Sequence, residues 1–175
     1  GWSRYTPAFD ASLDAVSAPV ASCSFGSAEN VSVDITNNGT SNITSLPMAY
    51  TINGGTAVTG TYTGTLTPGS STTYTFSTTA NLSSGSSFDI QIYNTASGDV
   101  CDDNDTTNAT LATQMNGVYT IGGSTPDYTT IAAALSDLGS IGVCGPVTFW
   151  LRDGTYYGSN AIGTISGASS TNTIT

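Results

Sequence analysis

The sequence predicts an all-β protein, and three features of its 175 residues support this prediction. It contains 31 Thr and 24 Ser, and Thr, Val, Ile and Tyr suit the pleated, half-buried surface of a strand. Gly, Asn and Asp, which supply tight turns, recur along the chain. Helix formers such as Glu, Lys, Gln and Arg are almost absent.

The first part of the chain follows a pattern of short strands and turns. Residues 1–12 have no clean period and are expected to be an incoming linker or strand. Val31, Val33 and Ile35 then alternate with polar residues, as expected of a half-buried strand. Roughly seven strands joined by Gly, Asn and Pro turns predict a β-sandwich over residues 13–113. The clearest further strands are 46–52, 58–66, 72–76 and 88–93.

A second pattern covers residues 114–175. Residues 118–121 form a short predicted strand, and residues 147–151 form a stronger one. Between them, apolar residues at helical spacing predict a helix with Asp127 as its N-cap. These apolar residues are Tyr128, Ile131, Leu135 and Leu138. The rest is rich in Gly, Ser and Thr, which suits short strands joined by tight corners.

Charge and hydropathy exclude several classes of partner. Twelve acidic residues against two arginines give a net charge of −10. Such a chain repels phosphate backbones and anionic membrane surfaces, so we expect no nucleic-acid partner. No apolar run approaches the roughly 18 residues of a membrane span, so we expect no membrane insertion. Gly1–Arg4 lacks a signal-peptide layout and Thr173–Thr175 ends within an apparent strand, so we expect an internal piece of a longer, processed protein.

Several segments resemble bacterial adhesion-related immunoglobulin-like modules. These are Glu29–Gly39 (ENVSVDITNNG), Leu66–Gly69 (LTPG), Tyr74–Phe76 (YTF) and Asn104–Thr106 (NDT). The resemblance spans about residues 13–112. Such modules are stacked in very long surface proteins that some Gram-negative bacteria export by the type IX route. The resemblance therefore implies an extracellular location at the bacterial cell surface.

The second part of the chain resembles the N-terminal cap and first rung of right-handed parallel β-helices in the same surface proteins. The matching segments are Gly117–Gly123, Asp127–Tyr128, Gly145–Phe149 and Asp153–Tyr156. The implied fold is an immunoglobulin-like β-sandwich followed by the helix-capped start of a parallel β-helix, which is cut short in the next rung. The helix would then plug the open end of the solenoid.

The three cysteines leave the disulfide pairing open. Two of the three are expected to pair in an exported protein. Cys23 and Cys101 lie near the two ends of the first module, so we predict a bridge between them. Cys144 would then be free, or would pair with another part of the chain or a second subunit. The alternative is three buried thiols that act as small apolar side chains.

An acidic turn is the candidate metal site. Asp99, Asp102, Asp103 and Asp105, together with Asn104, place several hard oxygens within seven residues. Calcium takes such ligands, and extracellular modules bind it weakly. The alternative is a solvated turn that joins two modules. Apart from this candidate calcium, the sequence indicates no cofactor.

Thr106 is the candidate modification site. The triplet Asp105–Thr107 resembles the Asp-Thr-Thr form of a bacterial O-glycosylation site. The motif is only three residues long and lies on an expected exposed turn.

No residues are predicted to be catalytic. The chain has no His, which excludes Ser-His and Cys-His nucleophile systems within it. Beyond residue 113 the charged residues are Asp127, Asp137, Arg152 and Asp153, and no two of them form a convincing acid/base pair. We therefore expect no enzyme in this segment.

The predicted function is a structural and adhesive segment of a large secreted surface protein, as a rigid spacer or fibre-forming unit. The expected partners are further copies of the chain in a homo-oligomer or fibre, or a surface glycan or other cell-surface target. The alternative is the non-catalytic N-terminal part of a β-helix protein that binds or degrades a polysaccharide.

Overall fold

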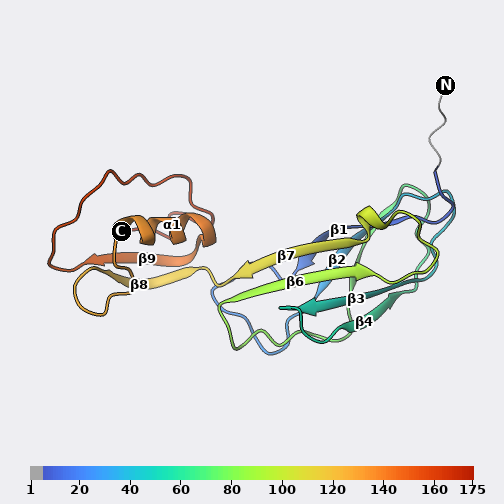
Figure 1. Cartoon of the computed structure of the whole chain (residues 1–175), viewed down its shortest axis with the longest axis horizontal. Coiled ribbons are helices and arrows are strands. Elements are labelled where there is room, and N and C mark those ends of the chain that lie inside the picture. The colour runs from blue at the N-terminus through green and yellow to red at the C-terminus, as the bar shows by residue number, and fades with distance from the viewer. Residues whose placement is uncertain (1–5) are drawn as a thin grey trace, which may run out of the picture. The chain divides into compact units, whose positions relative to one another are not determined.

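The computed structural model describes residues 6–175 and divides them into two compact units (Figure 1). The first unit comprises residues 6–20 and 26–111. The second comprises residues 112–175 together with a short segment, 21–25, that the chain contributes early. No helix in the described part of the chain is both long and apolar enough to cross a membrane.

The first unit is a β-sandwich with seven strands among the described residues. One sheet has the order β1-β2-β5 and the other the order β4-β3-β6-β7. The pairs β1–β2, β2–β5, β3–β4 and β3–β6 are antiparallel. The strands are β1 (Ala11–Ala18), β2 (Ser32–Asn37), β3 (Leu46–Ile52), β4 (Val58–Tyr62), β5 (Ser71–Thr75), β6 (Ser87–Asn94) and β7 (Thr106–Ala112).

Alternating apolar residues of the two sheets form the core of this sandwich. Val33 and Ile35 of β2 are fully buried, as are Ile90 and Ile92 of β6. Such alternation follows from the two-residue period of a strand, which sends every second side chain to the inner face. The predicted all-β sandwich in this part of the chain is therefore confirmed.

One strand was not predicted, and it changes the place of the acidic turn. β7 (Thr106–Ala112) follows the short 3-10 helix η1 (Asp102–Asn104) and pairs with β6 at the edge of its sheet. Only Leu111 in β7 is buried, so the strand lacks the alternating apolar pattern that sequence analysis uses. The acidic turn therefore lies inside the sandwich, and it is not the junction between two modules.

The second unit is built on parallel strands. β8 (Met115–Ile121) and β9 (Val143–Leu151) pair in parallel, with Tyr119 opposite Phe149. Parallel neighbours need a long crossover, and the helix α1 (Ile131–Ile141) is part of it. A third segment adds to the far side of β9 through a parallel bridge between Val147 and Ile174.

Helix α1 begins at a different residue from the one predicted. Thr130 is its N-cap, and the Thr130 side chain accepts a hydrogen bond from Ala133 N at 3.1 Å. The predicted cap, Asp127, instead binds Thr120 of β8. Gly142 ends the helix with a φ of 71°, a conformation that glycine adopts without strain.

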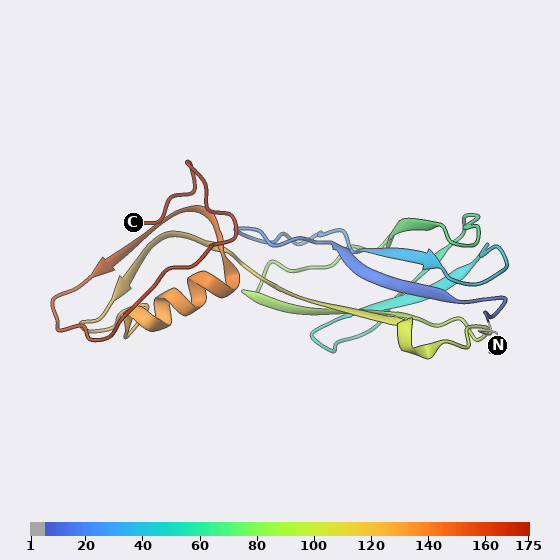
Figure 2. The same ribbon diagram turned by 90° about the horizontal axis from the view of Figure 1, so that it is seen from above.

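The helix and the parallel strands enclose a second apolar core. Leu138 of α1 packs with Met115, Val143 and Val147, and all four are at most 1% exposed. Partly buried side chains complete the cluster: Tyr119, Tyr128, Leu135, Ile141, Phe149, Ile165 and Ile174. Figure 2 shows α1 alongside the two strands whose inner side chains it covers. Residues as late as Ile174 therefore share one core with the helix.

Candidate functional site

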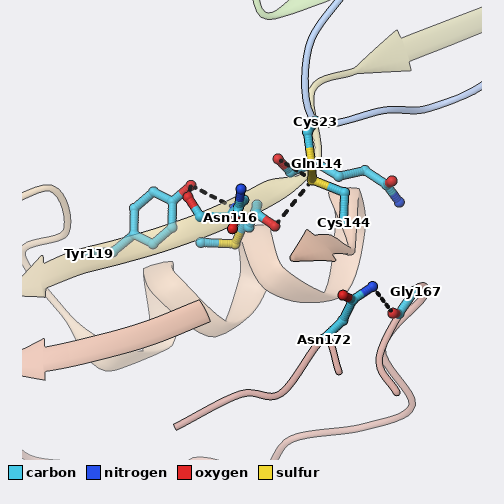
Figure 3. Close-up of a disulfide and its surroundings, with 8 residues drawn as sticks. Cys23, Gln114, Asn116, Tyr119, Cys144, Gly167 and Asn172 are labelled. Carbon is cyan, nitrogen blue, oxygen red and sulfur yellow. Dashed lines mark hydrogen bonds between the residues drawn. A yellow bond between two sulfur atoms is a disulfide. The ribbon is translucent and has the colours of Figure 1, made fainter. Parts of the chain in front are cut away.

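A disulfide joins two distant parts of the chain within the second unit (Figure 3). Cys23 lies between β1 and β2, and Cys144 is the second residue of β9. Their Cα atoms are 5.4 Å apart, within the range that disulfide geometry requires. The two cysteines are 121 residues apart in the sequence, so the bond closes a loop that contains β2 to β8 and α1.

The predicted bridge between Cys23 and Cys101 is therefore wrong. Cys101 lies near Asp10, just before β1, whereas Cys23 follows the end of β1. A strand of eight residues spans roughly 26 Å, which far exceeds the separation that a disulfide tolerates. Cys23 and Cys101 lie near the two ends of one module in the sequence, but Cys23 belongs to segment 21–25 of the second unit, whereas Cys101 lies in the first unit.

Backbone hydrogen bonds hold the segment that carries Cys23 against the start of β8. Gln114 N donates to Ser22 O at 2.9 Å, and Ser22 forms a parallel bridge with Thr113. The Cys144 Sγ atom lies 3.5 Å from the carbonyl oxygens of both Gln114 and Met115. A disulfide sulfur carries no hydrogen, so these are packing contacts. The disulfide therefore lies next to the hydrogen-bonded pairing of Ser22 with Thr113 and Gln114.

The same edge continues through two further segments. Met115 N donates to Gly142 O at 3.0 Å, and Val143 N donates to Ser166 O at 2.9 Å. Gly167 follows with a φ of 81°, and a Cβ atom there would collide with the Val143 carbonyl oxygen. Backbone hydrogen bonds therefore link the segments at residues 22, 114, 143 and 166 in that order, and the Ser22–Thr113 and Met115–Val143 pairings are parallel.

The third cysteine is a half-buried free thiol in the first unit. A hydrogen bond with the Asp10 carboxylate, followed by burial and nearby carboxylates, raises the pKa of Cys101. Asp10 is only 7% exposed, and it also accepts a hydrogen bond from Asn104 Nδ2 at 2.9 Å. The thiol therefore serves as a hydrogen-bond donor within a polar cluster.

Two of the four predicted calcium ligands meet in this cluster. Asn94 Nδ2 donates to Asp99 Oδ2 at 3.1 Å and to Asp105 Oδ1 at 2.8 Å. Asp99 also accepts from the backbone N–H groups of Ala11 (2.8 Å) and Cys101 (3.1 Å). Burial is the main cause that raises the pKa of Asp105. These carboxylates are thus held by protein donors.

The other two predicted ligands, Asp102 and Asp103, are exposed on η1. Across residues 6–175, no group of three or more His, Cys, Asp or Glu side chains is arranged to hold a metal ion. Asn104 Oδ1 is buried at this turn without a hydrogen-bond partner. Calcium binding at the turn stays a prediction.

Thr106, the predicted glycosylation site, is exposed at the first residue of β7. Its exposure leaves the hydroxyl group accessible to an enzyme. Attachment of a glycan there stays a prediction.

Three of the four charged residues of the second unit, Asp127, Asp137 and Arg152, form hydrogen bonds within it. Asp127 accepts from Thr120 N and Thr120 Oγ1, both at 2.7 Å, and these hydrogen bonds lower its pKa. Asp137 accepts from the Tyr128 hydroxyl at 3.0 Å. Arg152 donates to the Ser124 carbonyl oxygen at 2.7 Å. These contacts join the loop before α1 to β8 and to α1, and the residue after β9 to the loop after β8.

A cleft of about 450 Å³ lies beside the first turn of α1. Its lining consists of Gly, Thr, Ile, Ala and the two tyrosines Tyr156 and Tyr157. The Tyr156 hydroxyl donates to backbone oxygens of Ile121 and Arg152. The lining therefore contains no carboxylate, imidazole or amine for acid/base catalysis.

Comparisons with known proteins identify the first unit. A family model described as CARDB matches residues 13–112, which is more than half of the chain. The match covers the residues that resemble an adhesion-related immunoglobulin-like module in sequence. No curated protein matches the chain.

Two solved structures of one protein are similar to the chain. The crystal structure of the CARDB domain of PF1109 from Pyrococcus furiosus, in complex with di-metal ions, is 17% identical with a TM-score of 0.45. The match covers 63% of this chain and 94% of that one. The solution NMR structure of the same domain is 16% identical, with a TM-score of 0.45, and covers 62% and 95%. At these values the two structures support no inference about ligands of this chain.

Proposed function

Because this chain belongs to the CARDB family of adhesion-related immunoglobulin-like domains, we propose that it is a structural and adhesive segment of a larger secreted protein on the bacterial cell surface. The match over residues 13–112 is the observation that carries this proposal. CARDB is a non-catalytic, adhesion-related domain family. The role is therefore to hold and present a binding surface.

The disulfide supports a location outside the cytoplasm. Such bonds form and persist in oxidising compartments and are rare where thiols are kept reduced. Cys23 and Cys144 lie on the strand edge of the second unit, where the bond links two chain segments far apart in the sequence. The pair thus suits an extracellular protein that depends on the bond for its structure.

The parallel stack supports a solenoid as the continuation of the sandwich. Tyr119 lies opposite Phe149, and Val147 lies opposite Ile174, so equivalent positions recur at intervals of roughly 30 residues. Intervals of this size are typical of solenoid repeats, in which each turn contacts only its neighbours. Helix α1 covers the interior of the first turns. These contacts favour residues 114–175 as the helix-capped start of a right-handed parallel β-helix.

A sandwich followed by a solenoid forms a spacer whose stiffness comes from hydrogen bonds along the chain. A solenoid lengthens by adding turns, and its concave or flat faces offer extended binding surfaces. We propose that export follows the type IX route and that the parent protein forms rods or fibres that hold its binding regions away from the cell.

The experiment is surface detection combined with electron microscopy. Intact cells that produce the parent protein are labelled with an antibody raised against residues 6–175, before and after permeabilisation. The protein released from the surface is then imaged and incubated with a panel of polysaccharides. We expect labelling of intact cells, rod-shaped or fibrous particles, and no polysaccharide cleavage.

A strain that lacks the coding region for this segment provides the functional readout. Reduced attachment of this strain, with normal export of the remaining protein, supports the adhesive role. Labelling only after permeabilisation would overturn the surface location. Dispersed monomers that cleave a polysaccharide would instead favour the polysaccharide-degrading alternative.

A further inference from the structure

The Cys23–Cys144 bond changes the covalent path through the molecule. Along the backbone, a force applied at the two ends of the chain would have to pass through every residue. The disulfide offers a shorter covalent path that omits the 121-residue separation between the two cysteines. The omitted loop contains β2 to β8 and α1, which is most of the sandwich and the capping helix.

The elements that remain on the short path are already extended. β1 (Ala11–Ala18) leads toward Cys23, and β9 (Val143–Leu151) continues from Cys144. A strand rises about 3.3 Å per residue, close to the limit of an extended chain. Tension along β1 or β9 therefore gains almost no length by detaching either strand from its neighbours.

We propose that the Cys23–Cys144 disulfide is a mechanical bypass, which carries tension from β1 to β9 and shields the rest of the sandwich from forced unfolding. The inference rests on the proposed role as a surface spacer, because only a protein that is pulled needs such a bypass. The bond lies beside the hydrogen-bonded contact of Ser22 with Gln114. This contact keeps the two ends of the bypass in register before any load is applied.

The bypass limits how far a long adhesive protein lengthens under force. The lifetime of a domain under force is governed by its unfolding rate, and each unfolded domain lengthens the tether. Without the disulfide, unfolding of the loop between Cys23 and Cys144 would release about 400 Å of chain. With it, the ends of the loop stay joined even when noncovalent contacts fail.

Single-molecule force spectroscopy tests this directly. The full 175-residue chain is held through its two termini between reference domains of known contour length. It is pulled first as the oxidised protein and then after incubation with a phosphine reductant. We expect the oxidised chain to lack a long extension step, and reduction to add about 400 Å of released contour length.

The third cysteine provides a matched control. Cys101→Ser removes a thiol from the loop without touching the bond, and we expect it to behave as the oxidised wild type. Cys144→Ser is expected to show the long step without reductant. Should Cys144→Ser fail to fold, reduction of the folded wild type in the instrument gives the same comparison.

Two results would overturn the bypass. One is an oxidised wild-type chain that releases its full contour length. The other is a Cys101→Ser chain that shows the long extension step without reductant, which would mean that Cys101 forms the disulfide. The pulling experiment and the surface-labelling experiment test different claims. If the long step depends on reduction but the protein is not found on intact cells, the bypass is supported and the proposed surface function is contradicted.

Discussion

Asn37 donates through its Nδ2 atom to the carbonyl oxygen of Leu66 at 2.8 Å, in a fully buried contact between two turns of the sandwich. The same amide nitrogen donates to Ser41 O at 2.9 Å, and its Oδ1 atom accepts from Gly39 N at 3.0 Å. One side chain therefore satisfies three backbone groups at the end of β2.

We expect Asn37→Ala to lower the free energy of unfolding by about 1–3 kcal/mol, because it removes three hydrogen bonds made by one buried side chain. Asn38→Ala is the matched control, since the neighbouring side chain is exposed, and it should stay within about 0.5 kcal/mol of wild type. Urea unfolding of the three proteins provides the comparison. Equal stabilities would contradict the assigned role of Asn37.

Reduction of the disulfide should destabilise the protein by about 2–5 kcal/mol, because a long closed loop restricts the unfolded chain. Thermal unfolding with and without reductant measures this difference. Cys101→Ser should respond to reductant as wild type does, whereas Cys23→Ser should not respond at all. A response in Cys23→Ser would mean that another pair of cysteines is bonded.

Cys101 should react slowly with a disulfide reagent at pH 8. The hydrogen bond with Asp10 raises its pKa, so the reactive thiolate is scarce in the folded protein. Asp10→Asn should speed the reaction, and urea-unfolded protein should react fastest. Colorimetric thiol titration follows all three. Equal rates in folded and unfolded protein would contradict the assigned environment.

We expect protonation of Asp105 to stabilise the folded protein at acid pH. Burial raises its pKa, so the folded protein binds a proton at this carboxyl more readily than the unfolded chain does. This contribution is present below the pKa of the unfolded chain and is lost as pH rises through the folded value. Asp105→Asn should therefore gain stability relative to wild type between pH 3 and pH 7, measured by urea unfolding. The exposed Asp103→Asn control should show a smaller change.

Removal of residues 172–175 should expose the edge of β9. Val147 N donates to Thr173 O and Phe149 N donates to Thr175 O, both at 2.8 Å. Deletion of these four residues should speed hydrogen exchange at Val147 and Phe149. The Gln114 amide, which donates to Ser22 O, should be unaffected. Unchanged exchange at β9 would show that residues 172–175 do not cover its edge.

The sequence predicted the elements whose side chains follow a regular period. Val33 and Ile35 alternate with polar residues, and both are buried in β2. Leu135 and Leu138 follow helical spacing, and both contribute to the second core. In these cases the period of the sequence matches the face that is buried in the structure, so the pattern alone was enough to predict the strand and the helix.

The errors concern residues whose roles depend on distant partners. Asp127 has the chemistry of an N-cap, but Thr120 of β8 offers it two donors, and Thr130 caps the helix instead. The less exposed positions of β7 before Leu111 are Thr107 and Ala109, so its pairing with β6 left only a weak apolar pattern in the sequence. The bond to Cys144 depends on segment 21–25 joining the second unit, which no local pattern indicates.

That early segment also has a consequence for how such proteins diversify. Because residues 21–25 belong to the second unit while their flanking residues belong to the first, the two units interleave in the gene. A recombination event that exchanged residues 26–111 alone would preserve Cys23 and its partner. One that exchanged the sandwich as a single cassette from β1 onward would carry Cys23 away and leave Cys144 unpaired. The segment that carries Cys23 and the second unit that carries Cys144 are therefore expected to be inherited together.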